Sequence, residues 1–347
     1  MTLFLQAVAD GLQMGLLYAL VAVGLAIIWG LMEMINFAHG EFMMLGMFGA
    51  WGLSAWLGWD PLVTMVPLAV VMYGVGVLVY RGLMQKVQRG EVFTQIFATV
   101  GLLFFIQNGV VALFTSDYRF IEGSLLTRLS GANLSLGGIR VGVPLLVGGL
   151  IALGLFLLLY LLIDRTDFGL ALQATAEDRD AAMLVGIRPQ RMYAVAWGLG
   201  TALVAVAGVI LANFFSVYPQ AGLSFTVLAY AIVALGGFGS ILGTLLAALL
   251  VGVVQSVTAA YLPPAFKDAF VFGSYILIGL FRTQGIIGKK VTVKGWYRRA
   301  PMPYFEMLTL RVAGRTHNCY VYWIKLLSSL APLVFGFFLL LYAIALP

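Results

Sequence analysis

The sequence has little charge: only 10% of its 347 residues are Asp, Glu, Lys or Arg, against about 25% in soluble globular domains. Hydrophobic residues make up 62% of the chain, and its mean hydropathy is +1.02. This excludes a soluble globular protein and predicts an all-α, polytopic membrane protein. A single cysteine, Cys319, excludes an intrachain disulfide and a cysteine-based metal site. The first basic residue is Arg81, so the basic region that opens a cleavable signal peptide is missing.

Motifs for catalysis or nucleotide binding are also missing. The glycine-rich turn at 236–240 follows an apolar segment expected to be a helix rather than a strand, and it has no Lys-Ser or Lys-Thr pair. The stretch 285–290 fails the phosphate-loop pattern as well. No nucleophile constellation or metal-ligand spacing stands out. We therefore expect a protein that is not an enzyme and that needs no cofactor or metal.

Apolar runs of roughly 17–25 residues, each bounded by polar or turn residues, predict membrane-spanning helices. The 41 glycines agree with this, because small residues let membrane helices approach closely. About 8–10 spans are expected. We place them at 11–31, 40–57, 62–80, 92–114, 142–163, 192–214, 224–238, 241–261, 267–282 and 326–346.

The distribution of Lys and Arg predicts the orientation. If 81–91, 164–191 and 282–325 are cytoplasmic, that side holds 16 of these residues and the other side holds 4. Basic residues gather in cytoplasmic loops, so we expect an outside N-terminus and a cytoplasmic 164–191 loop. Three of the four outer basic residues lie in the 115–140 loop and are the exception to the pattern.

The longest polar interruption between spans is 164–191, which carries charges of both signs. Within it, 171–187 is expected to form a short helix that stops at Gly186. Such a helix cannot lie in lipid, where each charge would cost several kcal/mol. We interpret it as a water-facing surface on which another protein docks.

Polar residues near or inside the spans are candidates for a translocation path, since each needs a partner or a wet cavity. The densest group is at 33–41, where Asn36, His39 and Glu41 lie around Gly40. Three interpretations stay open. The segment is a broken helix that lines the path, or a cytoplasmic turn in which Asn36 caps the second span and Glu41 lies near its dipole. The third is a proton relay through His39 and Glu41.

Gln107, Asn108 and Asn213 lie inside other predicted spans. They either line the path or form interhelical hydrogen bonds worth roughly 0.6–2 kcal/mol each. Of these two interpretations, we favour the structural one.

Several stretches occur in order over residues 5–290: INFAHGEFMMLGMFGAW at 35–51, ATAEDRDAAMLVGI at 174–187, LGGFGSIL at 235–242, AYLPPAFKD at 260–268 and TQGIIG at 283–288. Together they resemble the permease subunits of branched-chain amino acid ABC importers. Within that family the chain is more similar to the subunit with the shorter N-terminus.

The resemblance implies an ABC importer permease fold over 1–290 in a bacterial inner membrane, with the chain forming the translocation path. It implies a second permease subunit, two cytoplasmic ATPase subunits that hydrolyse ATP, and a periplasmic solute-binding protein as partners. It makes 164–191 the ATPase-coupling loop, in which small residues allow close docking and charged residues form polar contacts. The small residues are Ala174, Ala181, Ala182 and Gly186, and the charged ones are Glu177, Asp178 and Arg179.

Residues 291–347 depart from the family pattern. A polar segment there leads to 326–346, which resembles the N-terminal span of the partner permease. A natural extension, a partial fusion and a gene-boundary artefact would all give this sequence. For the function, a urea or short-chain amide permease of the same family is the alternative. Outside the family, a proton-coupled secondary transporter and a non-transporting scaffold remain.

Overall fold

The computed structural model describes residues 2–88, 90–129, 133–136, 139–281 and 285–287. The predicted extension 291–347, including the span at 326–346, lies outside the described residues. So does Cys319.

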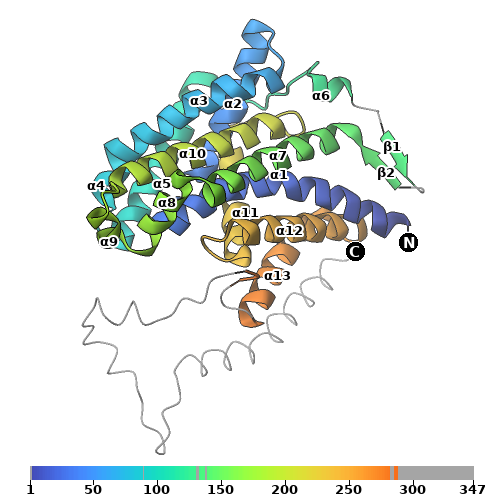
Figure 1. The fold of residues 1–347 in the computed structure, drawn as a ribbon. Coiled ribbons are helices and arrows are strands. Elements are labelled where there is room, and N and C mark those ends of the chain that lie inside the picture. The colour runs from blue at the N-terminus through green and yellow to red at the C-terminus, as the bar shows by residue number, and fades with distance from the viewer. Residues whose placement is uncertain (1, 89, 130–132, 137–138, 282–284, 288–347) are drawn as a thin grey trace, which may run out of the picture. The chain divides into compact units, whose positions relative to one another are not determined.

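Helices dominate, which confirms the all-α prediction (Figure 1). In chain order the elements are α1 (Thr2–Met32), α2 (His39–Leu57), α3 (Pro61–Val79), a π-helical turn (Tyr80–Met84), α4 (Gln85–Val87), α5 (Val92–Phe114), α6 (Leu125–Arg128), β1 (Asn133–Leu136), β2 (Ile139–Gly142), α7 (Val143–Arg165), α8 (Asp167–Glu177), α9 (Arg179–Leu184), α10 (Pro189–Leu211), α11 (Ala221–Gly236), α12 (Ile241–Tyr261), a 3-10 turn (Pro264–Phe266) and α13 (Lys267–Phe281). The strands β1 and β2 form an antiparallel hairpin.

Six helical segments of the described part are long and apolar enough to cross a membrane. They are Thr2–Met32, Pro61–Val87, Val92–Phe114, Val143–Arg165, Pro189–Leu211 and Ile241–Tyr261. The other spans predicted up to residue 282 fall on α2, α11 and α13, which are shorter or less apolar. The predicted boundaries hold closely except at α1, which begins at Thr2 instead of residue 11. Its added turns are tied to β2, where the Gln6 side chain exchanges hydrogen bonds of 2.6 and 2.7 Å with the Arg140 backbone.

The core lies around α1, α2 and α10, whose residues are mostly buried. Close contacts between backbones hold these helices together. A Cβ placed on Gly24 would lie 2.6 Å from the Gly200 carbonyl oxygen, and one on Gly46 would collide with Ala205. Tight packing of this kind needs glycine, because side chains would separate the helices.

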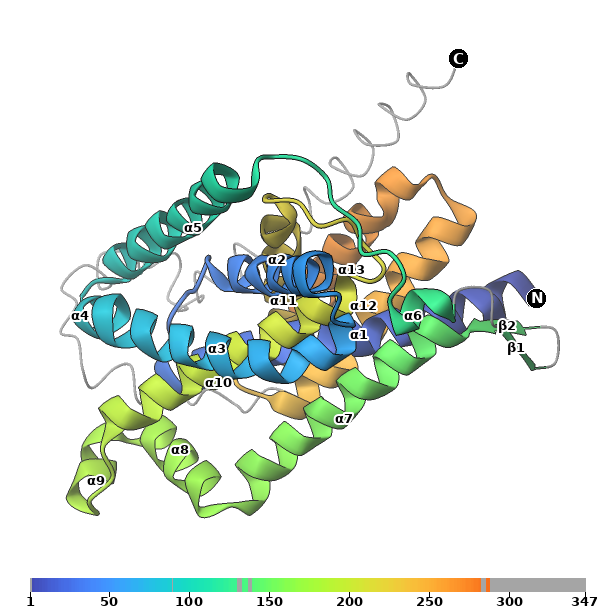
Figure 2. The ribbon, with the colours of Figure 1, turned by 90° about the horizontal axis from the view of Figure 1, so that it is seen from above.

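Helix α5 stands apart from the core (Figure 2). Of its side chains only Thr99, Leu103 and Val110 are buried, and they recur every four to seven residues along one stripe. The remaining surface carries exposed apolar side chains, including Phe97 and Phe105. In a membrane protein such a face is covered by lipid or by another membrane helix.

The α11–α12 turn is closed by the chain that follows α13. The backbone N–H groups of Ile286 and Ile287 donate to the Leu235 and Gly236 carbonyl oxygens at 2.9 and 3.2 Å. These carbonyls belong to the last turn of α11, where they have no partner within their own helix. The motif at 283–288 thus includes a C-terminal cap for α11.

Candidate functional site

The segment 33–38 interrupts the helical path between α1 and α2. Glu33 has a φ of 51°, in the left-handed region, and directs the chain out of α1. The His39 Nε2 atom lies 2.9 Å from the Val21 carbonyl oxygen. Val21 is in the interior of α1, about 16 Å from its end at a rise of 1.5 Å per residue. Helix α2 therefore begins beside the middle of α1, within the bundle.

Asn36, His39 and Glu41 are all fully buried. The Asn36 side-chain oxygen accepts a hydrogen bond of 3.1 Å from the Ala38 N–H, and the Asn36 N–H donates to the Tyr230 hydroxyl at 2.6 Å. The N-cap of α2 is Ala38, which makes no side-chain cap bond. Asn36 thus forms a turn just before α2, and the predicted N-cap by Asn36 is wrong. An Asn side chain is well suited to this turn because it bonds its own backbone two residues on.

Glu41 faces the first turn of α11. A Cβ on Gly222 would lie 2.7 Å from the Gly40 carbonyl oxygen and 2.8 Å from the Glu41 carboxyl carbon, so glycine is needed there. The Gly40 N–H donates to Thr226 Oγ1 at 2.9 Å, and the Thr226 hydroxyl donates to the Gly222 carbonyl at 3.0 Å. Among the described residues, neither Glu41 carboxylate oxygen has a hydrogen-bond partner. No hydrogen bond therefore joins His39 to Glu41, and the proton-relay interpretation lacks its connecting link.

The other three path candidates lie away from this group. Asn108 is exposed on α5, with Gln107 half-buried beside it. The Asn108 amide donates to the Phe104 carbonyl at 2.8 Å, and the Asn213 amide donates to the Val209 carbonyl at 2.9 Å. Both bonds go to the carbonyl four residues earlier, so the interhelical bonds predicted for Asn108 and Asn213 are not those observed. Asn213 follows the end of α10 at Leu211 and lies in the next turn.

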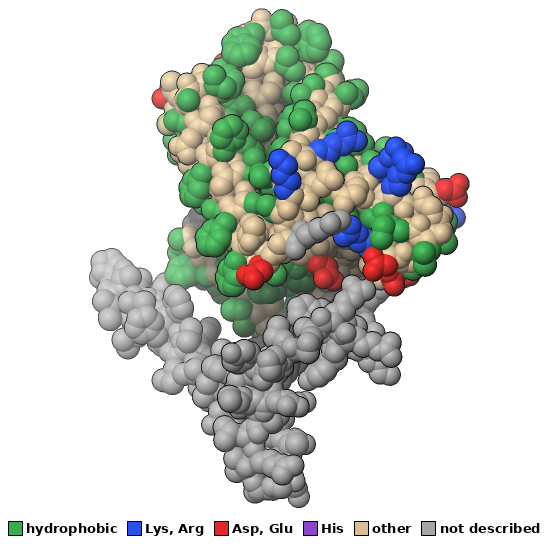
Figure 3. All heavy atoms as spheres, turned by 90° about the vertical axis from the view of Figure 1, so that its left-hand side faces the viewer, with side chains coloured by type: hydrophobic (Ala, Val, Ile, Leu, Met, Phe, Trp, Pro, Cys, Tyr) green, Lys and Arg blue, Asp and Glu red, His purple; other side chains and the backbone are tan. Residues whose placement is uncertain are grey.

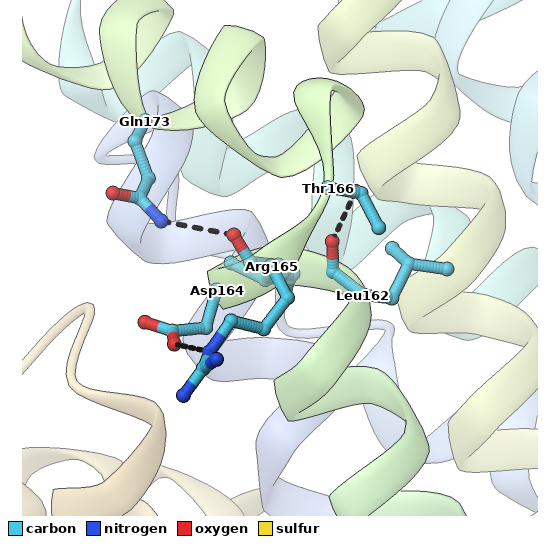
Figure 4. A network of polar contacts seen from close by, with 6 residues as sticks. Leu162, Asp164, Arg165, Thr166 and Gln173 are labelled. Carbon is cyan, nitrogen blue, oxygen red and sulfur yellow. Dashed lines mark hydrogen bonds and ion pairs between the residues drawn. The ribbon is translucent and has the colours of Figure 1, made fainter.

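The 164–191 loop begins with a tight corner between α7 and α8 (Figure 4). The Gln173 amide donates to the Ile163 carbonyl at 3.0 Å, and the Thr166 hydroxyl donates to the Leu162 carbonyl. Thr166 is also the N-cap of α8, accepting a 3.2 Å bond from the Gly169 N–H. A Cβ on Gly169 would collide with the Ile163 backbone. These contacts fix α8 against the end of α7.

The predicted single helix over 171–187 is wrong, because the chain forms α8 and α9 with a break at Asp178. The Asp178 carboxylate accepts bonds of 2.9 and 3.0 Å from the Asp180 and Ala181 N–H groups, which caps α9. Asp is among the best N-cap residues and is a weak helix former in a helix interior. The predicted stop at Gly186 is confirmed: its φ is 87°, and its N–H donates to the Met183 carbonyl.

Exposure within this loop differs from the predicted docking set. Ala182 is only 3% exposed and packs inside the chain, so it is not part of the docking surface. Ala174 and Arg179 are half-buried, whereas Glu177, Asp178, Ala181 and Gly186 are exposed. The most prominent side chains are two that the sequence analysis missed, Leu184 at 89% and Val185 at 76% exposure. The signal for them was the apolar run just before Gly186, in a loop that must face water.

Charged side chains of both signs lie at the end of the molecule that carries α4, α8 and α9 (Figure 3). The Tyr80 hydroxyl donates to Gln190 Oε1 at 3.2 Å, which joins the end of α3 to the start of α10 at this end. The exposed basic side chains in or next to the helices at this end are Arg81, Lys86, Arg165, Arg188 and Arg191. Acidic side chains lie beside the basic ones in the same view. The surface is thus mixed in charge, with an apolar tip at Leu184 and Val185.

Comparison with known proteins matches residues 7–279 to the family model described as branched-chain amino acid transport system, permease component. The chain is 32% identical over 295 residues to the high-affinity branched-chain amino acid transport system permease protein BraD of Pseudomonas aeruginosa, covering 82% of this chain and 96% of that protein. It is 30% identical to the corresponding permease protein LivH of Escherichia coli, with the same coverage. A probable branched-chain amino acid transport permease protein of Methanocaldococcus jannaschii is 30% identical over 81% of this chain and 90% of that protein. No solved structure matches the chain significantly.

Proposed function

The chain belongs to the family of permease components of branched-chain amino acid transport systems, and from this we propose that it carries branched-chain amino acids through a membrane. It is a multi-pass membrane protein and the permease subunit of an ABC importer. We propose that separate ATPase subunits drive it. The names of the relatives support the choice of substrate over urea or short-chain amides.

The observation that carries the ATP-driven mechanism is the placement of α8 and α9. This pair connects α7 directly to α10, and α10 runs into the core against α1, α2 and α3. Leu184 and Val185 protrude from the pair into water. Exposed apolar side chains surrounded by charges are typical of a protein interface. We assign this tip, with Glu177, Asp178, Arg179, Ala181 and Gly186 around it, to the docking surface for an ATPase subunit.

We assign the free face of α5 to a second permease subunit. Asn108 is exposed in the middle of a membrane-spanning helix, and Gln107 is half-buried next to it. An amide facing lipid is costly, so a polar side chain at this depth needs protein or water around it. A second permease that covers α5 would place protein around these amides. A solute path between the two subunits would also bring water to them.

We assign the inner part of the path to Asn36, His39 and Glu41. They lie where the first turns of α2 and α11 meet, and irregular backbone at membrane depth is tolerated where it is covered by protein or lines a cavity. Because all three are buried, a solute reaches them only when α2 and α11 move apart. Asn213 lies away from this group and bonds the carbonyl groups of its own turn of chain, so we assign it a structural role.

For the location we propose a bacterial inner membrane, with α8 and α9 in the cytoplasm and the N-terminus outside. The exposed basic side chains around α4, α8 and α9 support this, since cytoplasmic loops are enriched in Lys and Arg. A periplasmic solute-binding protein then delivers substrate to the opposite end.

The test is purification of the tagged chain from its native membrane, followed by reconstitution of the recovered complex into vesicles. We expect an ATPase and a second permease to co-purify. The vesicles should take up radiolabelled leucine only when ATP and a solute-binding protein are supplied, and unlabelled isoleucine or valine should compete. Competition by urea or acetamide alone would move the substrate to the alternative class. Uptake that needs a proton gradient and ignores ATP would refute the mechanism.

A further inference from the structure

The connection that leaves α5 is fastened to a distant part of the chain. We call residues 115–121 the strap. The Arg119 N–H donates to the Val217 carbonyl at 2.9 Å, and the Val217 N–H donates back to the Arg119 carbonyl at 2.8 Å. This isolated antiparallel bridge joins the strap to the turn between α10 and α11. Figure 2 shows the strap leaving the end of α5 and crossing toward α6.

Side chains strengthen the bridge. The Arg119 guanidinium lies 4.1 Å from the centre of the Trp51 ring and 5.9 Å from that of Phe114. Its Nη2 atom donates to the Phe114 carbonyl. The rings of Tyr118 and Tyr218 pack with their centres 4.8 Å apart. Arg119 is thus fixed by aromatic rings and a carbonyl, and among the described residues it makes no ion pair.

The strap begins with strained backbone. Thr115 has a φ of 64° and a ψ of 179°, a region that is almost restricted to glycine. A β-branched residue there is a genuine outlier. Its hydroxyl donates to the Asp117 carboxylate, which holds the turn. Such strain persists only where the surrounding structure enforces it, and here the fastened strap does so.

The strap connects two parts of the molecule to which transport has been assigned. On one side it continues α5, whose last residue, Phe114, packs against the rings of Trp51 and Trp56 at the end of α2. On the other side Val217 lies between α10, whose first residue follows the α8–α9 loop, and Gly222, which contacts Glu41. The docking tip and Val217 thus lie at the two ends of one helix, α10, and the bridge links its far end to the strap that follows α5.

We propose that the strap is an outer gate whose Arg119–Val217 bridge must open in each transport cycle, with Arg119 as the positioning residue that holds it closed. This inference rests on the proposed function. Opening the bridge would release the strain at Thr115, and this offsets part of the cost of breaking the contacts, which suits a gate. When the bridge breaks, Thr115 relaxes and the strap no longer ties the end of α5 to the turn between α10 and α11.

The test is a reversible disulfide across the bridge, Arg119→Cys with Val217→Cys, in a chain carrying Cys319→Ser. Residues that exchange both hydrogen bonds in an antiparallel pair have Cα atoms about 5.5 Å apart, within the roughly 4.4–6.8 Å that disulfides span. The complete complex in vesicles is oxidised, the disulfide is verified by mass spectrometry, and ATP-driven leucine uptake is measured before and after reduction. We expect uptake to be lost on oxidation and to return on reduction to the level of the never-oxidised double-cysteine protein, which also lacks the Arg119 side chain and is therefore the reference. Equal uptake by the fully oxidised and the reduced protein would overturn the gate.

Leu134→Cys with Val141→Cys is the matched control, because these residues pair within the β1–β2 hairpin in the same outer loop. Its oxidation should leave uptake unchanged. Wild-type vesicles report on the proposed function separately: if they fail to take up leucine, the function fails, whereas normal wild-type uptake with an insensitive disulfide removes the gate alone.

Two further variants separate gating from simple structural support. Thr115→Gly relieves the strain of the closed strap, so the protein should melt at a higher temperature yet show slower maximal uptake at an unchanged half-saturating leucine concentration. Arg119→Ala should raise ATP hydrolysis in the absence of solute, and Arg119→Lys, which keeps a cation over Trp51, should reverse much of that rise. Unchanged maximal uptake in Thr115→Gly, together with unchanged basal ATP hydrolysis in Arg119→Ala, would show that the strap only stabilises the fold and is not a gate.

Discussion

Single glycines set how closely the long helices of this protein approach one another. A Cβ on Gly15 would lie 2.7 Å from the Leu249 Cα atom, and one on Gly252 would meet the Gly11 carbonyl. No side chain can rotate away from such a contact, because the obstacle is backbone. Positions of this kind determine the architecture of the core, whereas other glycines face open space.

Helix α3 provides both kinds of glycine two residues apart. A Cβ on Gly76 would lie 2.6 Å from Thr201 Oγ1 and 2.7 Å from the Trp197 carbonyl oxygen, whereas one on Gly74 would meet nothing within 4 Å. We expect Gly76→Ala to lower the stability by about 1–3 kcal/mol, the usual cost of overpacking. Gly74→Ala should leave it unchanged or raise it slightly. Thermal unfolding in detergent measures both, and equal melting temperatures would contradict the close approach of α3 and α10.

Substitutions of His39 distinguish a structural role of its side chain from a proton-carrying one. A glutamine side chain can present an amide nitrogen where the His39 Nε2 atom lies, 2.9 Å from the Val21 carbonyl. We expect His39→Gln to keep the melting temperature and the ATP-driven uptake, because the amide donates the same hydrogen bond. His39→Ala should lower stability by about 2–4 kcal/mol, since it leaves a buried cavity and removes a buried hydrogen bond. Loss of uptake in well-folded His39→Gln, read at several pH values, would revive the proton relay.

At the scale of elements, the sequence predicts the long helices well because span length follows from bilayer thickness. It predicts Gly186 as a helix stop because glycine adopts a positive φ at little cost, and the φ of Gly186 is 87°. It does not predict the break at Asp178, because the same aspartate fits either an exposed helix position or an N-cap. The burial of Ala182 was missed for a related reason: a loop with charges on every face gives no periodicity that identifies the inner side.

The α8–α9 tip gives the sharpest prediction at this scale. Burying a Leu or Val side chain contributes about 1.5–3 kcal/mol, so Leu184→Ser with Val185→Ser should weaken ATPase binding by an order of magnitude or more. Leu170→Ser is the control, since Leu170 is also exposed on α8, at 61%, but lies away from the tip. Co-purification of the ATPase, measured against membrane content of the permease, reports the result. Normal recovery with the tip variant would place the docking surface elsewhere.

At the scale of the whole described part, α10 joins features that the chain separates widely. Its first turn follows the docking tip, its middle packs on Gly24 and Gly76, and its end leads to Val217. Contacts such as Glu41 with Gly222 or Arg119 with Val217 could not be predicted, because nothing local in either segment specifies a partner about a hundred or more positions away. Glu41 is nevertheless recognisable as a candidate from the sequence, because it lies among polar residues between two apolar runs. The sequence does not show that Glu41 packs against Gly222 in the first turn of α11.

Membrane orientation is the remaining property of the whole molecule, and two single cysteines decide it. In a chain with Cys319→Ser, Tyr118→Cys places a thiol on the strap and Leu184→Cys places one on the docking tip, at side chains 67% and 89% exposed. If α8 and α9 face the cytoplasm, a membrane-impermeant maleimide should label Tyr118→Cys in cells with an intact inner membrane and Leu184→Cys only after lysis. The physical reason is the excess of Lys and Arg near α4, α8 and α9, which resists transfer across the bilayer. The reverse labelling pattern would show the opposite membrane orientation, with α8 and α9 outside the cell. It would then exclude a cytoplasmic ATPase at the tip, because Leu184 and the strap lie at opposite ends of the path through α10.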